Sequence, residues 1–210
     1  MVSLERIREL IKDERFEEAY RLLSAGDPSF AENLEATRLL GLVCTRMGRY
    51  AEAAEYYELV CKGSNDSEDW FDLAMARLMA DDVVHGVVAI EEAKRRYTKG
   101  KMTVPMMLFH FIGVLLERGF WDAAKRYLEE LAETYAEAGK SSDAFLFAHD
   151  LPLFGWFLNA VVRAYKGSSS QKAGIAWLKS IAPRFDAEGQ TKIANAIRLL
   201  SAPPDGRPQK

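Results

Sequence analysis

The stretch Gly41–Leu59, GLVCTRMGRYAEAAEYYEL, decides the fold of this chain. Its small and apolar residues recur at helical spacing on both sides of a central Met-Gly-Arg, which predicts two antiparallel helices joined by a tight turn. Gly41 and Ala53 are small enough to let the two helices approach closely, and Tyr50 and Tyr57 are large enough to fill the space toward a neighbour. One hairpin cannot bury its own apolar face, so the sequence predicts further hairpins stacked beside it.

The same pattern recurs along the chain at a spacing of 34 residues. A fourth copy follows 37 residues after the third, with Trp121, Ala124 and Leu128 in the matching places. Regular self-similarity of this length is typical of stacked helical repeats. The first three copies align Phe16, Tyr50 and Val84 at the turn, Ala19, Ala53 and Val87 in the second helix, and Leu10, Cys44 and Leu78 in the first.

The unit resembles a tetratricopeptide repeat, because Leu40 and Gly41 precede a Gly48-x-Tyr50 turn that is followed by Ala53 and Tyr57. The resemblance implies an all-α fold, a right-handed α-solenoid of helix-turn-helix repeats with a C-terminal capping helix. The third copy departs from the pattern, with Asp81-Asp82 in place of the glycine turn. We expect one solenoid over residues 1–201, with repeats at about 1–33, 34–67, 68–103, 104–138 and 153–184, an irregular insertion at 139–152, a capping helix at 186–200 and a flexible tail at 202–210.

The composition limits the possible function classes. With 49% hydrophobic and 28% charged residues and a net charge of -3, the chain has the composition of a globular protein and lacks the basic excess of a nucleic-acid-binding domain. The N-terminal residues are charged and lack the apolar core of a secretory signal. The longest uncharged run, residues 102–116, is too short to cross a membrane. We therefore expect a cytoplasmic protein that neither binds nucleic acid nor inserts into a membrane.

No stretch of the sequence carries a catalytic motif. Cys44 and Cys61 lack metal or redox spacing, and His85, His110 and His149 are isolated from one another and from the cysteines. We therefore expect no catalytic residue, no metal and no cofactor. An enzyme is kept only as a remote alternative.

The resemblance implies a binding function, because in that family the inner face of each first helix lines a groove that holds an extended or helical peptide. The implied groove is charged at one end and apolar at the other. Asp69 and Asp72 interrupt the basic cluster that would grip a C-terminal carboxylate, which favours an amphipathic peptide. We expect Arg38 and Arg46 to bind its charges without contributing to stability. The implied groove residues are Glu35, Arg38, Leu42, Thr45, Arg46, Asp69, Asp72, Ala76, Met79, Met106, Phe109, Gly113, Leu116, Phe154, Phe157 and Val161.

A surplus of apolar residues between Phe145 and Phe157 leaves two interpretations open. In the first, the insertion folds back to seal the repeats or lies within their groove. In the second, it exposes an apolar surface for a partner or for a second copy of the chain. The alternative function is therefore a self-associating assembly scaffold, with a homodimer as its simplest form. The sequence does not identify the partner protein.

Overall fold

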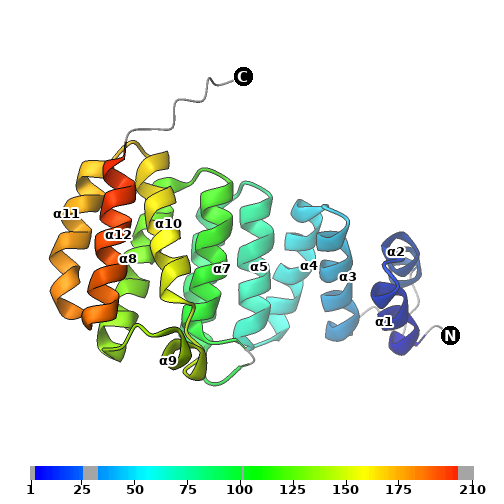
Figure 1. Ribbon diagram of the computed structural model, residues 1–210. Coiled ribbons are helices and arrows are strands. Elements are labelled where there is room, and N and C mark those ends of the chain that lie inside the picture. The colour runs from blue at the N-terminus through cyan, green and yellow to red at the C-terminus, as the bar shows by residue number, and fades with distance from the viewer. Residues whose placement is uncertain (1–2, 26–32, 101, 203–210) are drawn as a thin grey trace. The chain divides into compact units, whose positions relative to one another are not determined.

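The computed structural model describes residues 3–25, 33–100 and 102–202 (Figure 1). It contains twelve α-helices and one short 3-10 helix, with no strand among these residues, so the predicted all-α class is confirmed. The chain divides into two compact units, Met1–Lys101 and Met102–Lys210. A single solenoid through both units stays a prediction.

Unit 1 consists of three helical hairpins. The first hairpin packs on the second through one cluster of buried residues, which includes Ile7, Leu10, Leu23, Leu39 and Val43. This packing buries the apolar faces that a lone hairpin would leave exposed. The helices are α1 (Leu4–Lys12), α2 (Phe16–Ser24), α3 (Leu34–Arg46), α4 (Tyr50–Gly63), α5 (Ser67–Met79) and α6 (Val83–Arg96).

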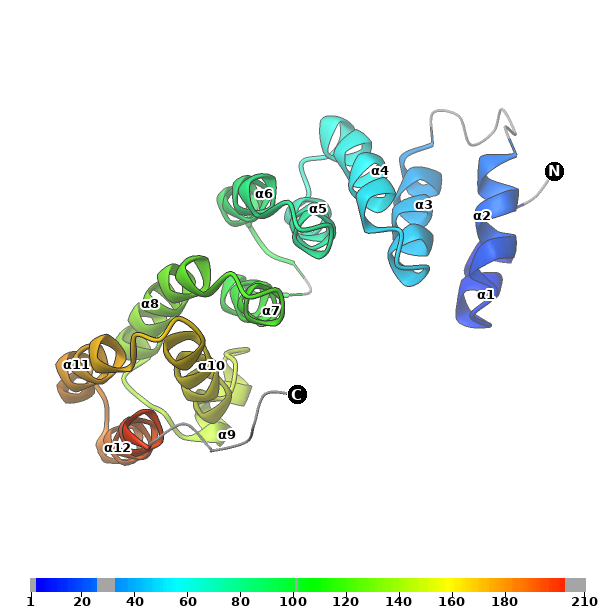
Figure 2. The same ribbon diagram turned by 90° about the horizontal axis from the view of Figure 1, so that it is seen from above.

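Unit 2 has two hairpins, a short intervening helix and a terminal helix. Figure 2 shows α10, α11 and α12 end-on and side by side. The terminal helix occupies almost the same residues as the predicted capping helix, whereas the predicted tail lies outside the described residues except for Ala202. The elements are α7 (Val104–Glu117), α8 (Trp121–Ala138), α9 (Asp143–Ala148), α10 (Phe154–Gly167), α11 (Gln171–Ile181), the 3-10 helix Ala182–Arg184 and α12 (Ala187–Ser201).

Every hairpin turn has the same backbone. Three residues separate the two helices in each of the five hairpins that the described residues form, and the middle one has a positive φ: Glu14, Gly48, Asp81, Gly119 or Ser169. The N–H of the next residue donates to a carbonyl five residues back at 2.8–2.9 Å, which satisfies a helix-terminal carbonyl. The aspartate that interrupts the sequence pattern in the third copy therefore adopts the conformation of the glycines in the second and fourth.

Gly41 leaves room for an aromatic ring inside the second hairpin. A Cβ atom at this position would lie 2.8 Å from the ring of Tyr57. The ring of Tyr57 on α4 thus fills the space left by the glycine on α3. Tyr57 is 4% exposed, so any larger residue at 41 must displace a buried aromatic ring.

The insertion at 139–152 packs on its own unit. The Tyr135 hydroxyl donates to the Pro152 carbonyl at 2.6 Å, and the buried Ser141 hydroxyl donates to the carboxylate of Asp186. That carboxylate also accepts from the backbone N–H of Gly189 at 2.8 Å, so it caps α12 as well. Side-chain hydrogen bonds therefore connect the insertion to α8 and to the start of α12.

Among the described helices, none is both long and apolar enough to span a membrane.

Two glycines of unit 2 test the importance of the turn backbone. Gly119 has φ +79°, whereas Gly113 lies inside α7, and an added Cβ would meet at most ordinary contact at either position. We expect Gly119→Ala to lower the free energy of unfolding by about 1 kcal/mol, because left-handed backbone disfavours a Cβ. Gly113→Ala should raise it by roughly 0.5–1 kcal/mol, because alanine favours helix. Urea unfolding followed by circular dichroism measures both, and changes of the same sign would contradict the assignment of the turn.

Candidate functional site

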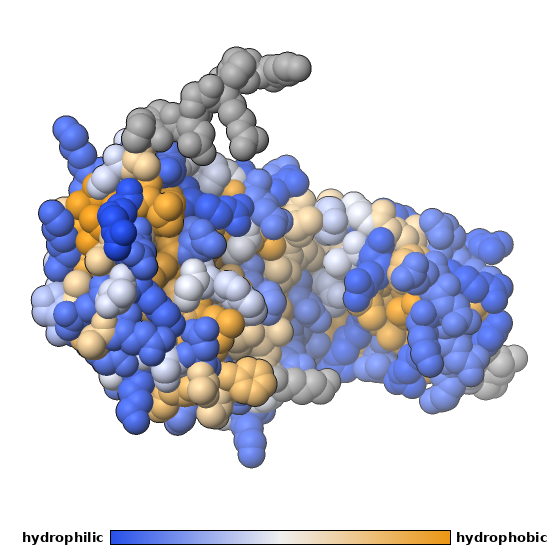
Figure 3. Space-filling view, viewed as in Figure 1, coloured by the Kyte–Doolittle hydropathy of each residue, from blue (hydrophilic) through white to orange (hydrophobic). Residues whose placement is uncertain are grey.

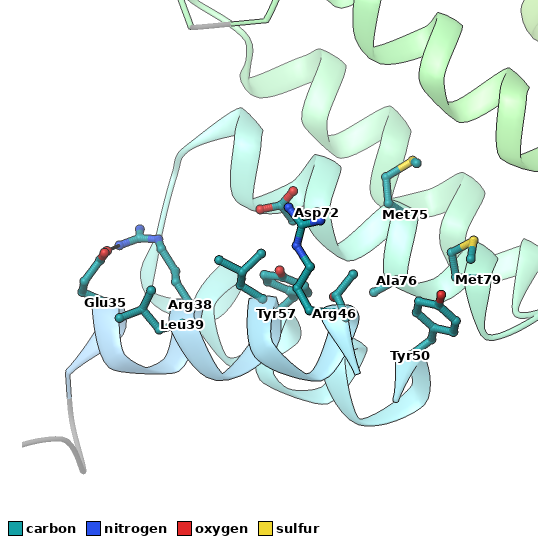
Figure 4. Close-up of a pocket in the computed structure, with 12 residues that line it drawn as sticks. Glu35, Arg38, Leu39, Arg46, Tyr50, Tyr57, Asp72, Met75, Ala76 and Met79 are labelled. Carbon is teal, nitrogen blue, oxygen red and sulfur yellow. Dashed lines mark ion pairs between the residues drawn. The ribbon is translucent and has the colours of Figure 1, made fainter. Parts of the chain in front are cut away.

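Unit 1 contains an open cavity of about 590 Å³ between α3, α4 and α5 (Figure 4). Every implied groove residue of α3 lines it, as do three of the four on α5. The implied groove lacks four of the residues that line the cavity, Leu39, Tyr50, Tyr57 and Met75, although Met75 lies one helical turn before Met79 on α5. The lining residues are Glu35, Arg38, Leu39, Leu42, Thr45, Arg46, Tyr50, Tyr57, Asp72, Met75, Ala76 and Met79.

An ion pair joins α3 to α5 beside this cavity. Arg38 Nε lies 2.8 Å from Asp69 Oδ1, and its Nη2 lies 2.8 Å from Oδ2, so the guanidinium and the carboxylate form a bidentate pair. Asp69 is 5% exposed and does not line the cavity. Arg38 also lies 3.5 Å from Glu35 and donates to the Ser64 hydroxyl at 3.4 Å. Its donors are thus engaged within the chain.

The ion pair shifts the pKa values of both partners. Burial alone would raise the pKa of Asp69, but hydrogen bonds from Arg38 and Ser64 and the positive charge of Arg38 together lower it below its ordinary value. The pKa of Arg38 is raised, first through its hydrogen bonds to Asp69. Both groups are therefore charged at neutral pH and hold each other in place.

This geometry corrects the expectation that Arg38 is free to bind a partner. Removing Arg38 would leave the buried carboxylate of Asp69 without its cation, which costs about 2 kcal/mol, less than for a fully buried pair because the Arg38 side chain is 34% exposed. A variant with both Arg38→Glu and Arg46→Glu would lose stability along with any binding. Arg46 differs, because it is exposed and makes no hydrogen bond or ion pair within the described part of the chain.

The rest of the cavity wall is largely apolar. Leu42, Tyr50, Met75 and Met79 are all partly exposed, so their apolar surface is available to a ligand. Tyr57 forms part of the wall, and burial raises the pKa of its hydroxyl, which keeps it neutral. Methionine side chains adapt to ligands of different shape. The cavity therefore combines a flexible apolar surface with one unpaired cation.

The implied groove residues of unit 2 do not form a comparable site. Phe154 and Phe157 are both 0% exposed, and their ring centroids lie 5.5 Å apart. The Tyr135 ring packs against both of them, and Phe185 packs against Phe154. The two phenylalanines thus belong to the core, and no partner reaches them in this conformation. Leu116 and Val161 are buried as well.

The exposed aromatic surface of unit 2 lies at other residues. Trp156 is 54% exposed and stacks on the half-buried Phe109 at 6.0 Å, and Phe147 on α9 is 80% exposed. In Figure 3 apolar side chains gather at the end of unit 2 where Figure 1 shows α9. Met106 is also half-buried on α7. The apolar surplus at 145–157 therefore divides between core and surface.

A second hollow of about 500 Å³ lies between α4, α5 and α6 of unit 1. Its floor includes Trp70 and Leu73. Its charges are paired within the chain, since Arg77 lies 2.6 Å from Glu58 and 3.3 Å from Asp82. None of the residues that line this second hollow is an unpaired charge comparable to Arg46. We therefore take the cavity between α3, α4 and α5 as the candidate site.

The cysteines and metal-ligating side chains show no reactive arrangement. Cys44 and Cys61 are buried and unbridged, and burial raises the pKa of their thiols to about 11 and about 12. Both are therefore protonated at neutral pH and poorly nucleophilic. Within the described ranges, no three histidine, cysteine, aspartate or glutamate side chains come together as a metal site.

The pair between Arg38 and Asp69 predicts an acid-sensitive contribution to stability. Because the pKa of Asp69 is lowered in the folded protein, this contribution is complete above the unfolded-state pKa of about 3.9 and is lost as the pH falls through the lower folded value. Asp69→Asn should lower the free energy of unfolding at pH 7 by about 2 kcal/mol. In acid the free energies of unfolding of the variant and the parent protein should converge. Urea unfolding between pH 7 and pH 3 measures this.

The exposed Glu55→Gln serves as the control in the same unit and should follow the parent protein at every pH. A constant difference between Asp69→Asn and the parent down to pH 3 would contradict the assigned ion pair.

Comparison with known proteins adds no family to this description. A scan against models of protein families finds no match, and no curated protein is significantly similar to the chain.

Proposed function

We propose that the protein binds a segment of a partner protein in the cavity between α3, α4 and α5. One observation supports this proposal. The repeat resemblance implies groove residues on α3 and on α5, and eight of them line the same open cavity. Its volume of about 590 Å³ lies within the range typical of ligand sites. The site would act as an interaction module or adaptor.

The side chains that line the cavity favour peptide binding over catalysis. No histidine, cysteine or serine is among the residues that line the cavity, and the ring of Tyr57 stays neutral. Arg38 is held by Asp69. What remains accessible is apolar surface from Leu42 and Met79 beside Arg46, which suits an amphipathic helix or an extended segment with apolar anchors.

We further propose that the hairpins are tetratricopeptide-like repeats of a right-handed solenoid in a cytoplasmic protein. The support is the shared three-residue turn with its left-handed middle residue in all five described hairpins. The 34-residue spacing of the first copies gives independent support from the sequence.

Peptide selection tests the binding site directly. A library of random peptides displayed on phage is selected on the full-length protein, and the Kd of each enriched peptide is measured by fluorescence anisotropy. We expect Leu42→Arg and Met79→Arg to weaken binding by more than about tenfold, because each places a charge on the apolar wall. Both side chains are partly exposed, so the variants should fold, and circular dichroism verifies this.

The matched control is Leu59→Arg, the same type of change at a 53% exposed leucine on α4 that does not line the cavity. It should leave the Kd unchanged. Equal weakening by all three variants, or by none, would reject this cavity as the site.

Self-association is the second candidate function, and the exposed aromatics of unit 2 favour it. Trp156 and Phe147 are 54% and 80% exposed, and apolar side chains gather on the surface near α9 in Figure 3. Exposed apolar patches are typical of interaction surfaces. If they form a homodimer interface, Trp156→Asp and Phe147→Asp should return the mass measured by light scattering to that of one chain, 23.7 kDa.

Leu199→Asp, at a 54% exposed leucine on α12, is the control for that measurement. Phe154→Asp and Phe157→Asp are unsuitable, because both residues are core and their replacement would unfold the unit. A parent protein that is monomeric at all concentrations would remove the second candidate.

A further inference from the structure

We propose that the segment bound between α3, α4 and α5 carries an acidic side chain that pairs with Arg46 and lies within one turn of an apolar anchor. This inference rests on the proposed function and specifies its ligand. It follows from the charges that line the cavity, which are Glu35, Arg38, Arg46 and Asp72.

Three of these four charges are already engaged within the chain. Glu35 lies 3.1 Å from Arg8 and 3.5 Å from Arg38. Arg38 pairs with Asp69 through two hydrogen bonds of 2.8 Å. Asp72 is engaged in an interaction within the chain as well. A partner that offered a charge to any of the three would have to compete with a bond that exists already.

Arg46 is the exception among the four. It is exposed, it lines the cavity, and no hydrogen bond or ion pair holds it in residues 3–25, 33–100 and 102–202. As the last residue of α3 it is favoured by the helix dipole, which explains why a cation is tolerated there without a partner. The dipole does not explain its position among cavity-lining residues.

Binding of a segment in the cavity favours an acidic side chain on that segment. A segment that covers the apolar wall also covers the Arg46 guanidinium, and a guanidinium that is removed from water without a partner is costly. A carboxylate offers the guanidinium two parallel hydrogen bonds and removes that cost. The acidic residue must lie close to an apolar one, because Leu42 precedes Arg46 by one helical turn on the same face of α3.

Charge reversal at Arg46 tests this proposal with the same displayed library and full-length protein. Peptides selected on the parent protein should be enriched in Asp or Glu beside an apolar residue, and those selected on Arg46→Glu should carry Lys or Arg there instead. In a parent-selected peptide, replacing the acidic residue by its amide should weaken binding by about tenfold. The same replacement should have little effect on Arg46→Gln.

The matched control is Arg21→Glu, which makes the same change of charge at an exposed arginine on α2, outside the cavity. It should select the same acidic peptides as the parent. Peptides that depend on Leu42 and Met79 but show no acidic preference, or no reversal with Arg46→Glu, would overturn the inference and leave the proposed function standing. Peptides that ignore Leu42 and Met79 would overturn both.

Discussion

The reversal of the chain within three residues is the constraint on which each hairpin of this protein depends. A turn that short requires its middle residue to adopt the left-handed conformation, and all five described hairpins meet this requirement. The two helices then run back antiparallel and present matching faces to one another. Small residues and aromatic rings complete the packing of the two helices. In the second hairpin, for example, the ring of Tyr57 occupies the space beside Gly41.

The candidate site depends on how the second hairpin meets the helix that follows it. Arg38 and Asp69 join α3 to α5 by a bidentate ion pair in which the carboxylate of Asp69 is buried and the Arg38 side chain is partly exposed. The pair therefore links α3 and α5, two of the three helices that line the cavity. It also removes Arg38 from the set of binding residues and leaves Arg46 as the cation that a ligand can reach. One arginine serves stability, and the other is available for recognition.

The sequence predicts the helices better than the roles of their side chains. Periodicity and the Gly48 turn are local properties, so the all-α class and the hairpin positions follow from them. Asp81 breaks the glycine pattern without changing the turn, because aspartate tolerates the left-handed region. The contacts of Arg38 and Phe154 do not follow from the local sequence, since each includes a partner 31 residues away, Asp69 and Phe185 respectively.

Site-specific photocrosslinking tests the central claim most directly, because it asks which residues a partner touches. A benzophenone side chain is placed at Met79 in the cavity and, in a second protein, at the exposed Leu59 outside it. Each protein is illuminated in extract from the cells that make it. The account predicts one discrete adduct from position 79, mapped by mass spectrometry to a short partner segment and abolished by Leu42→Arg. Identical adducts from both positions, or none from position 79, would contradict it.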